Sequence, residues 1–176
     1  MSELATLSPY GVRTETTTVR IQRLLPGPIE RVWAYLTESD LRRQWLASGP
    51  MALTAGGEVE LTWRNGELTP HEEARPEGMP EERRMNSQVL RVDPPRLLAF
   101  SWGEGDVTFE LELQGGEVLL TVTHRRLLDR GSLLNVSAGW HAHLDLLADR
   151  VAGREPGPFW SHWSSLRGEY EARLPE

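Results

Sequence analysis

The chain of 176 residues carries 26 acidic and 19 basic residues, a net charge of -7 and no cysteine. This length supports one globular domain with a full core, and the lack of cysteine excludes thiol chemistry and disulfides. The acidic charge argues against nucleic-acid binding, which needs a basic face. No apolar stretch approaches the ~20 residues of a membrane span. The first residues lack the basic and apolar regions of a secretory signal, so we expect a cytoplasmic protein.

The N-terminal third predicts a strand followed by two short helices. Residues 1–15 show no periodicity and are predicted to form a flexible lead-in. Apolar residues alternate with polar ones from Thr16, which is typical of a half-buried strand, and Pro26-Gly27-Pro28 ends it. Apolar residues then recur at helical spacing over 28–36 and again over 39–46, which predicts the two helices.

The middle of the chain predicts an antiparallel meander. Short turns rich in Gly and Pro separate segments in which apolar and polar residues alternate. These segments are EVELTWR, SQVLRV, LLAFSW, VTFELEL and EVLLTVTHR. A long segment at 65–81, rich in Pro, Gly and Glu and containing His71, separates the first two. It is interpreted either as a cover over a site or as a solvated loop.

The C-terminal third changes from a period of 2 to a period of 3.6. From Ser132 an apolar stripe predicts a long helix that ends near Gly153. Residues 154–176 are predicted to form a helical extension that packs on the same domain. The fold class is therefore α+β, with the apolar face of the antiparallel sheet and the apolar stripe of the long helix covering each other. A strongly curved sheet would leave a cavity between the two, because the helix alone would not fill its concave side.

Strand parity and the helix stripe predict which side chains face this cavity. The residues predicted to bind a ligand there are Trp63, Phe100, Trp102, Phe109, Leu111, His124, Trp140, His143, Leu144 and Leu147. For Trp33 and Trp45 we favour a place in the core. Arg64, Ser101, Glu110 and Glu112 have outward parity and are left out of the site.

Several segments over residues 16–153 carry a resemblance to a known family, in the family's order. They are PGPIERVWAYLTESDLRRQW, the Gly-Gly before EVELTW, VLRVDPPRLLAFSW, VTFELE, TVTHRRL and GWHAHLDLLADRVAG. These segments resemble the activator of heat-shock protein 90 ATPase-like branch of the SRPBCC superfamily, the START-related helix-grip proteins. The resemblance implies the helix-grip fold with a hydrophobic cavity, over residues 16–153. The co-chaperones that give the branch its name have a further N-terminal domain, which is not expected in the short lead-in here.

Histidines are the candidate acid or base groups near neutral pH. His124 shares the inward parity of its strand, and His143 lies on the inner stripe of the long helix, so both are candidate catalytic residues, although no catalytic role is assigned. His141 is expected to pair with Asp145 at the surface, four residues on. Because residues two apart on a helix diverge by roughly 200°, His141 and His143 are not expected to share a metal ion, and no metal or cofactor is predicted.

Three functions fit this sequence. We favour binding of a small hydrophobic or aromatic molecule in the cavity, without catalysis. The first alternative is a cyclase- or hydratase-type enzyme in which a pocket histidine moves a proton. The second is a protein-interaction or chaperone-associated module that uses Trp160 or Trp163 in an exposed last helix. The same surface also suits a homodimer, which the sequence leaves open.

Overall fold

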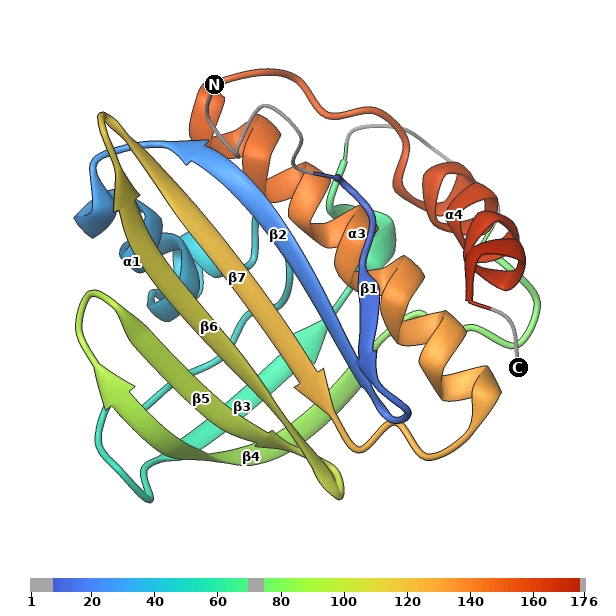
Figure 1. The fold of residues 1–176 in the computed structure, drawn as a ribbon, viewed down its shortest axis with the longest axis horizontal. Helices are drawn as coiled ribbons and strands as arrows, with labels where there is room; N and C mark the ends of the chain where they lie inside the picture. The colour runs from blue at the N-terminus through green and yellow to red at the C-terminus, as the bar shows by residue number, and fades with distance from the viewer. Residues whose placement is uncertain (1–7, 70–74, 175–176) are drawn as a thin grey trace.

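The structure is a computed structural model that describes residues 8–69 and 75–174 (Figure 1). Its centre is a seven-stranded antiparallel sheet in the order β1-β2-β7-β6-β5-β4-β3. The strands are β1 (Val12–Glu15), β2 (Thr18–Pro26), β3 (Glu58–Trp63), β4 (Arg83–Asp93), β5 (Leu97–Trp102), β6 (Gly105–Gln114) and β7 (Glu117–Arg125).

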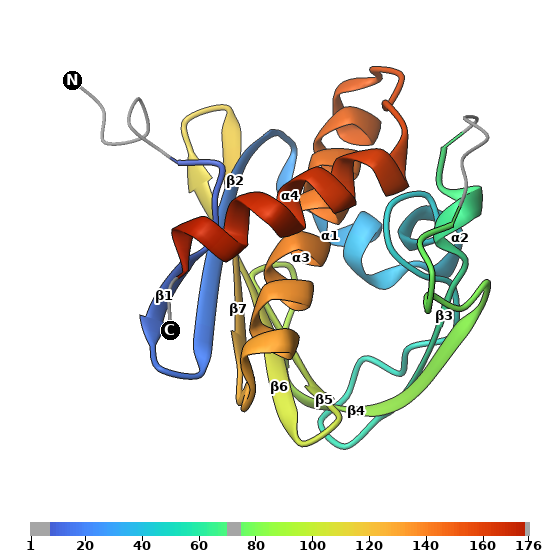
Figure 2. The same cartoon turned by 90° about the vertical axis from the view of Figure 1, so that its right-hand side faces the viewer.

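The helices lie on the concave side of this sheet. They are α1 (Ile29–Thr37), α2 (Ser39–Arg42), the 3-10 turn η2 (Asn65–Glu67), α3 (Arg130–Ala152) and α4 (Phe159–Arg173). Figure 2 shows the sheet curving around α3, with α4 crossing the outer side of α3. The predicted α+β helix-grip fold, with two short helices after the first long strand, is confirmed. No helix in the described part of the chain is long and apolar enough to cross a membrane.

Alternation along the strands places the core on one face of the sheet. On β6, Val107, Phe109 and Leu111 are buried against the helices, whereas Glu110 and Glu112 are exposed on the other face. This matches the period of 2 in the sequence, because neighbouring side chains on a strand point to opposite faces. Burial of this continuous apolar face is the main force that holds the sheet against α3.

Both ends of α3 carry residues typical of helix boundaries, of which Gly153 is predicted from the sequence. Asp129 caps the N-terminus by accepting a hydrogen bond from the backbone N–H of Ser132 at 2.8 Å. Gly153 ends the helix with a φ of 73°, a left-handed conformation that favours glycine. The long helix therefore has fixed ends and presents a constant stripe to the sheet.

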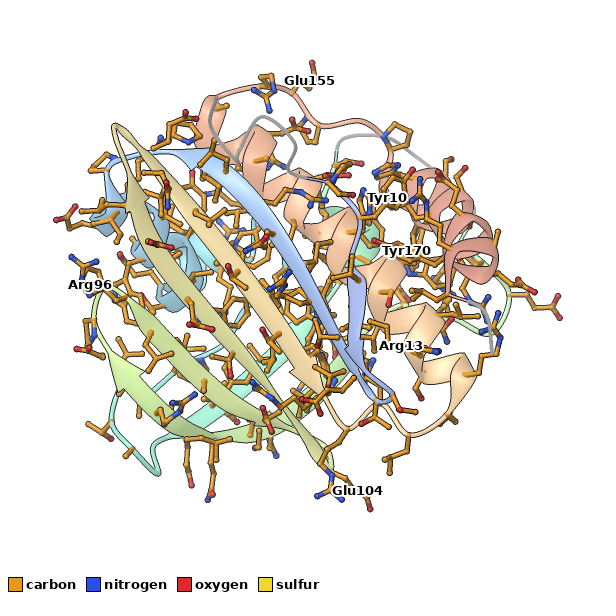
Figure 3. All side chains as sticks on the ribbon, in the orientation of Figure 1. Tyr10, Arg13, Arg96, Glu104, Glu155 and Tyr170 are labelled. Carbon is orange, nitrogen blue, oxygen red and sulfur yellow. The ribbon has the colours of Figure 1, made fainter. Side chains whose placement is uncertain are left out.

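The chain before the first long strand differs from the prediction. Residues 12–15, expected in a flexible lead-in, form the edge strand β1. Its side chains are mostly exposed on both faces, so it has no alternating apolar pattern by which it could be found. The segment before it is tied to α4, because Tyr10 donates a hydrogen bond to Glu169 at 2.5 Å and the Gly11 N–H donates to Tyr170 Oη at 2.7 Å. Figure 3 shows Tyr10 and Tyr170 side by side.

The segment between α1 and β3 forms its own part of the core. Trp45 is fully buried and donates its indole N–H to the Tyr35 carbonyl at 2.8 Å, and Trp33 is half-buried against the core. Arg42 is also buried, and its guanidinium donates to the backbone carbonyls of Leu36, Thr37, Ala47 and Gly49. Trp45 therefore lies in the core as expected, whereas Trp33, on α1, is half-buried and packs against the core.

Candidate functional site

A cavity of about 210 Å³ lies between α3, α4 and the ends of the strands. Most of its wall is aromatic or aliphatic, and it includes described parts of the 65–81 segment. The lining residues are Leu46, Trp63, Asn65, Met79, Pro80, Arg83, Trp102, Asn135, Val136, Gly139, Trp140, His143, Phe159, Trp160 and Trp163. A concave apolar site with few polar groups is typical of small-molecule binding.

Five of the seven tryptophans form this wall. Trp63 and Trp102 end two strands with inward parity, and their ring centroids are 5.3 Å apart in an edge-to-face arrangement. The ring centroid of Trp102 lies 5.5 Å from that of Trp140 on α3, and the ring centroids of Trp160 and Trp163 on α4 are 6.2 Å apart. The wall therefore offers ring faces and edges, the arrangement that a flat aromatic guest packs against.

His143 provides a polar atom in this wall. Its Nδ1 lies 2.8 Å from the Trp45 carbonyl oxygen. A carbonyl only accepts, so Nδ1 carries the proton and Nε2 carries a lone pair. Burial lowers the pKa of His143 to about 4, so the ring is neutral at pH 7. His143 is thus a hydrogen-bond acceptor on the cavity side of α3.

Two further polar groups belong to the wall. Asn65 Oδ1 is buried and has no hydrogen-bond partner among residues 8–69 and 75–174. A buried acceptor without a partner costs about 1–3 kcal/mol, which a ligand with a donor would recover. The guanidinium of Arg83, on an exposed residue, lies 5.5 Å from the centroid of the Trp63 ring. Two residues of the wall, Asn65 and His143, thus carry acceptor atoms, and a third, Arg83, is an exposed cation.

The residues predicted to bind a ligand separate into two groups. Trp63, Trp102, Trp140 and His143 line the cavity. The others are buried in the core behind this wall and are not among its lining residues: Phe100, Phe109, Leu111, His124, Leu144 and Leu147. Parity identifies the side of the sheet correctly, but it does not distinguish residues at the open end of the strands from those packed deep under the helix.

His124 has a partner inside the core. Its Nδ1 accepts a hydrogen bond from the indole N–H of Trp140 at 3.0 Å, and the ring is 2% exposed. Burial lowers the pKa of His124 to about 4, so the ring is neutral and holds Trp140 in place. We therefore interpret His124 as a residue that positions the cavity wall.

Sequence reasoning missed the contribution of α4 to the wall, whereas it had interpreted the 65–81 segment as one candidate cover over a site. Phe159, Trp160 and Trp163 come from α4, and Met79 and Pro80 come from the 65–81 segment. Trp160, expected on an exposed interaction surface, is only 6% exposed, and Trp163 is half-buried. The clustering of aromatic residues at the start of the last helix was the available signal. His71 lies outside the described residues.

A second polar cluster joins α3, α4 and β2. Asp145 Oδ1 accepts from Arg23 Nε at 3.2 Å and from Nη2 at 2.9 Å, and Asp145 Oδ2 lies 2.7 Å from His162 Nε2. His141 Nε2 lies 3.4 Å from the same Oδ2, and its Nδ1 lies 2.8 Å from Tyr170 Oη. The surface position expected for His141 is wrong, because β2 and α4 cover this face of α3 and leave the residue 4% exposed.

Both the sequence and the fold of this chain resemble those of known proteins. Residues 26–152 match the family model described as Activator of Hsp90 ATPase homolog 1-like protein. The solution NMR structure of the protein encoded by gene BPP1335 from Bordetella parapertussis is 41% identical, with a TM-score of 0.79, over 95% of this chain and 91% of that chain.

Two other solved structures have the same fold. The crystal structure of CalU16 from Micromonospora echinospora is 25% identical with a TM-score of 0.65, over 89% of this chain and 87% of that chain. The conserved protein of unknown function EF2215 from Enterococcus faecalis is 19% identical with a TM-score of 0.71, over 93% and 90%. No curated protein matches the sequence. The family match over 26–152 and the 41% identical structure show that this chain belongs to the Activator of Hsp90 ATPase homolog 1-like family, a branch of the SRPBCC helix-grip proteins.

Proposed function

We propose that the protein binds a flat, mostly apolar molecule with one hydrogen-bond donor in the aromatic cavity. The observation that carries this proposal is a wall of five tryptophans that also includes Asn65, whose buried Oδ1 has no hydrogen-bond partner in the described part of the chain. The family's fold commonly holds hydrophobic ligands, which supports the same function.

The cavity volume sets the size of the ligand. An apolar cavity of about 150 Å³ takes up benzene. The 210 Å³ found between α3, α4 and the strand ends therefore accommodates about one to two fused rings. A hydroxyl or amino group on that ring would donate to Asn65 Oδ1 or to His143 Nε2, and the apolar remainder would pack on the indole rings.

The state of His143 favours binding over proton transfer. A general base works best when its pKa is near the working pH. The pKa of His143 is lowered by burial to about 4, and its Nδ1–H is held by the Trp45 carbonyl. Such a ring accepts a hydrogen bond but is a weak base at pH 7.

The indole N–H signals in a ¹H–¹⁵N NMR spectrum test the proposal, with 2-naphthol and naphthalene as probes. We expect 2-naphthol to shift the five cavity indole signals and to leave those of Trp33 and Trp45, which lie outside the wall. Native mass spectrometry of the freshly purified protein would show any ligand that remains bound. If neither probe shifts the cavity signals, or if all seven indole signals shift alike, the proposal is wrong.

A pair of asparagine variants tests the polar contact. Asn65→Leu removes the unpartnered acceptor and should lower the affinity for 2-naphthol up to about tenfold, the worth of one hydrogen bond, with little effect on naphthalene. Asn135→Leu is the matched control, because Asn135 also lines the cavity but its Oδ1 already accepts from Arg167 Nε at 2.6 Å. Equal losses in the two variants would contradict the role given to Asn65.

A further inference from the structure

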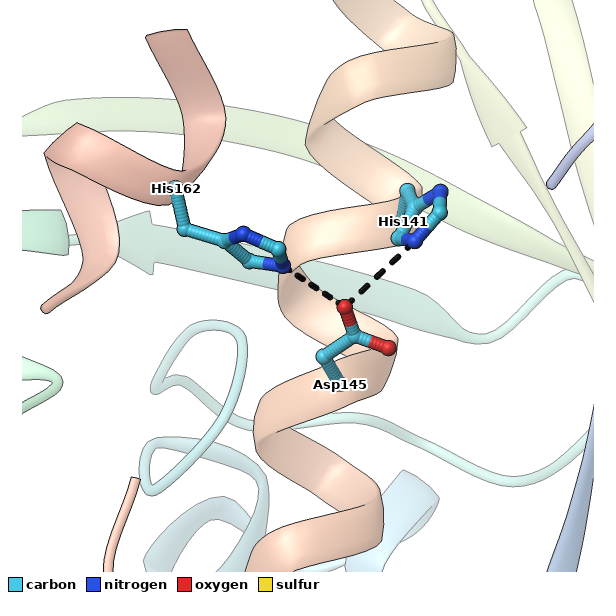
Figure 4. Close-up of side chains that lie close together, drawn as sticks. All are labelled: His141, Asp145 and His162. Atoms are coloured by element: carbon cyan, nitrogen blue, oxygen red, sulfur yellow. Dashed lines mark hydrogen bonds and ion pairs between the residues drawn. The ribbon is translucent and has the colours of Figure 1, made fainter. Parts of the chain in front are cut away.

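Three ligand atoms of a type suited to metal binding converge between α3 and α4, away from the aromatic cavity. His141 Nε2, Asp145 Oδ2 and His162 Nε2 all lie within 4.8 Å of one another (Figure 4). Both imidazole nitrogens face the same carboxylate oxygen, at 3.4 and 2.7 Å. Ligand atoms about 2.0–2.1 Å from a tetrahedral zinc ion are about 3.3 Å apart. Small side-chain rotations would therefore bring all three atoms to coordination distance.

We propose that His141, Asp145 and His162 form a binding site for a divalent transition-metal ion such as zinc. Two imidazoles and one carboxylate are a donor set that suits zinc and its neighbours better than magnesium or calcium. The expectation that no metal is bound rested on His141 and His143, which do diverge, since His143 contacts the Trp45 carbonyl instead. The second imidazole comes from α4, which the spacing within α3 does not reveal.

The groups around these ligands hold them in the required orientation. Arg23 donates twice to Asp145 Oδ1, which leaves Oδ2 to face the two imidazoles. His141 Nδ1 lies 2.8 Å from Tyr170 Oη, so Nδ1–H can donate there while Nε2 faces an ion. Such outer partners are typical of metal sites because they fix the tautomer and direction of each ligand. The positive charge of Arg23 also limits the affinity, so we expect weaker binding than in a structural zinc site.

The site is open on one side. The side chain of His141 is 6% exposed, that of Asp145 is 35% exposed and that of His162 is 45% exposed. Asp145 and His162 also line a groove of about 600 Å³ between α3 and α4. An ion can enter through this groove, and a water or an anionic group would occupy the fourth coordination position. Three protein ligands and one open position are typical of zinc sites that exchange ligands.

Isothermal titration of the metal-stripped full chain with ZnCl₂ tests the site. We expect one zinc ion per chain in the wild type. His162→Gln keeps an N–H donor near Asp145 but removes an imidazole ligand, and it should weaken binding by about 100-fold, the upper end of the loss seen for an outer partner. Ser165→Ala is the matched control, because Ser165 is exposed on the same helix and lines the same groove.

The zinc titration gives the same answer whether or not the aromatic cavity binds a ligand, because the two sites share no residue. Substitution of the half-exposed His162 should leave the fold intact, and circular dichroism checks this. The absorption spectrum of the Co²⁺ form reports metal coordination without relying on the heat of binding. Its coordination bands should be lost in His162→Gln but not in Ser165→Ala. The proposal is overturned if the wild type binds no zinc, or if His162→Gln binds it as well as the wild type does.

Discussion

Acidification should destabilise the protein through its three buried imidazoles, His124, His141 and His143. Burial is the main cause that lowers the pKa of each from 6.5 to about 4. The unfolded chain therefore binds these three protons below pH 6.5, whereas the folded chain binds them only near pH 4. The resulting stability is fully present above pH 6.5 and is lost as the pH falls toward 4.

The size of the effect follows from proton linkage. Each histidine with these pKa values removes about 2 kcal/mol of unfolding free energy between pH 7 and pH 5. The three together remove about 5–6 kcal/mol, which is comparable to the whole stability of many domains. His162 opposes this loss, because its hydrogen bond to Asp145 raises its pKa above 6.5, so the folded chain binds this proton more readily than the unfolded chain as the pH falls.

Urea unfolding at pH 7, 6 and 5 in the presence of a chelator measures this loss. His124→Gln should reduce the loss between pH 7 and pH 5 by about 2 kcal/mol, whatever its cost at pH 7. His162→Gln is the control and should not reduce the loss, because the raised pKa of His162 opposes it. A total loss below about 2 kcal/mol in the wild type, the share of one histidine, would refute the assignment of three neutral buried rings.

Two further substitutions, each with a control variant, test a close backbone contact and a buried hydrogen bond. Gly49→Ala should destabilise the protein by about 3 kcal/mol or more in urea unfolding, because its φ is 127° and a Cβ would lie 2.0 Å from a backbone oxygen. Gly56→Ala, at φ 82° with nothing within 4 Å, should cost only about 1–2 kcal/mol, and equal losses would contradict this reasoning. Trp140→Phe should cost about 1–3 kcal/mol, since it leaves His124 Nδ1 without its donor, whereas Trp33→Phe should have a smaller effect.

Most elements of the fold were predictable because their signals are local. Alternation identified the long strands, and the period of 3.6 ending at Gly153 identified α3. The edge strand β1 was missed because it is exposed on both faces and so has no periodic pattern. Alternation therefore fails for a strand that buries neither face, whereas the other edge strand, β3, buries one face and was identified.

The candidate sites were less predictable because they depend on which elements meet. Arg23 has the inward parity of its strand, an early sign of a buried ion pair, but its partner Asp145 is distant in the sequence. His141 was placed at the surface because its own helix does not reveal that α4 covers it. Periodicity shows which face of an element is inward, whereas it does not show what packs on the opposite face.

The position of α4 places part of the proposed binding site outside the segment that matches the family model. The family match ends at residue 152, and the wall residues Phe159, Trp160 and Trp163 lie beyond it. One side of the cavity is therefore built by a segment outside the part that defines the family. If the cavity binds a ligand as proposed, substitutions in this one helix would change which molecules fit while the sheet and the long helix stay unchanged.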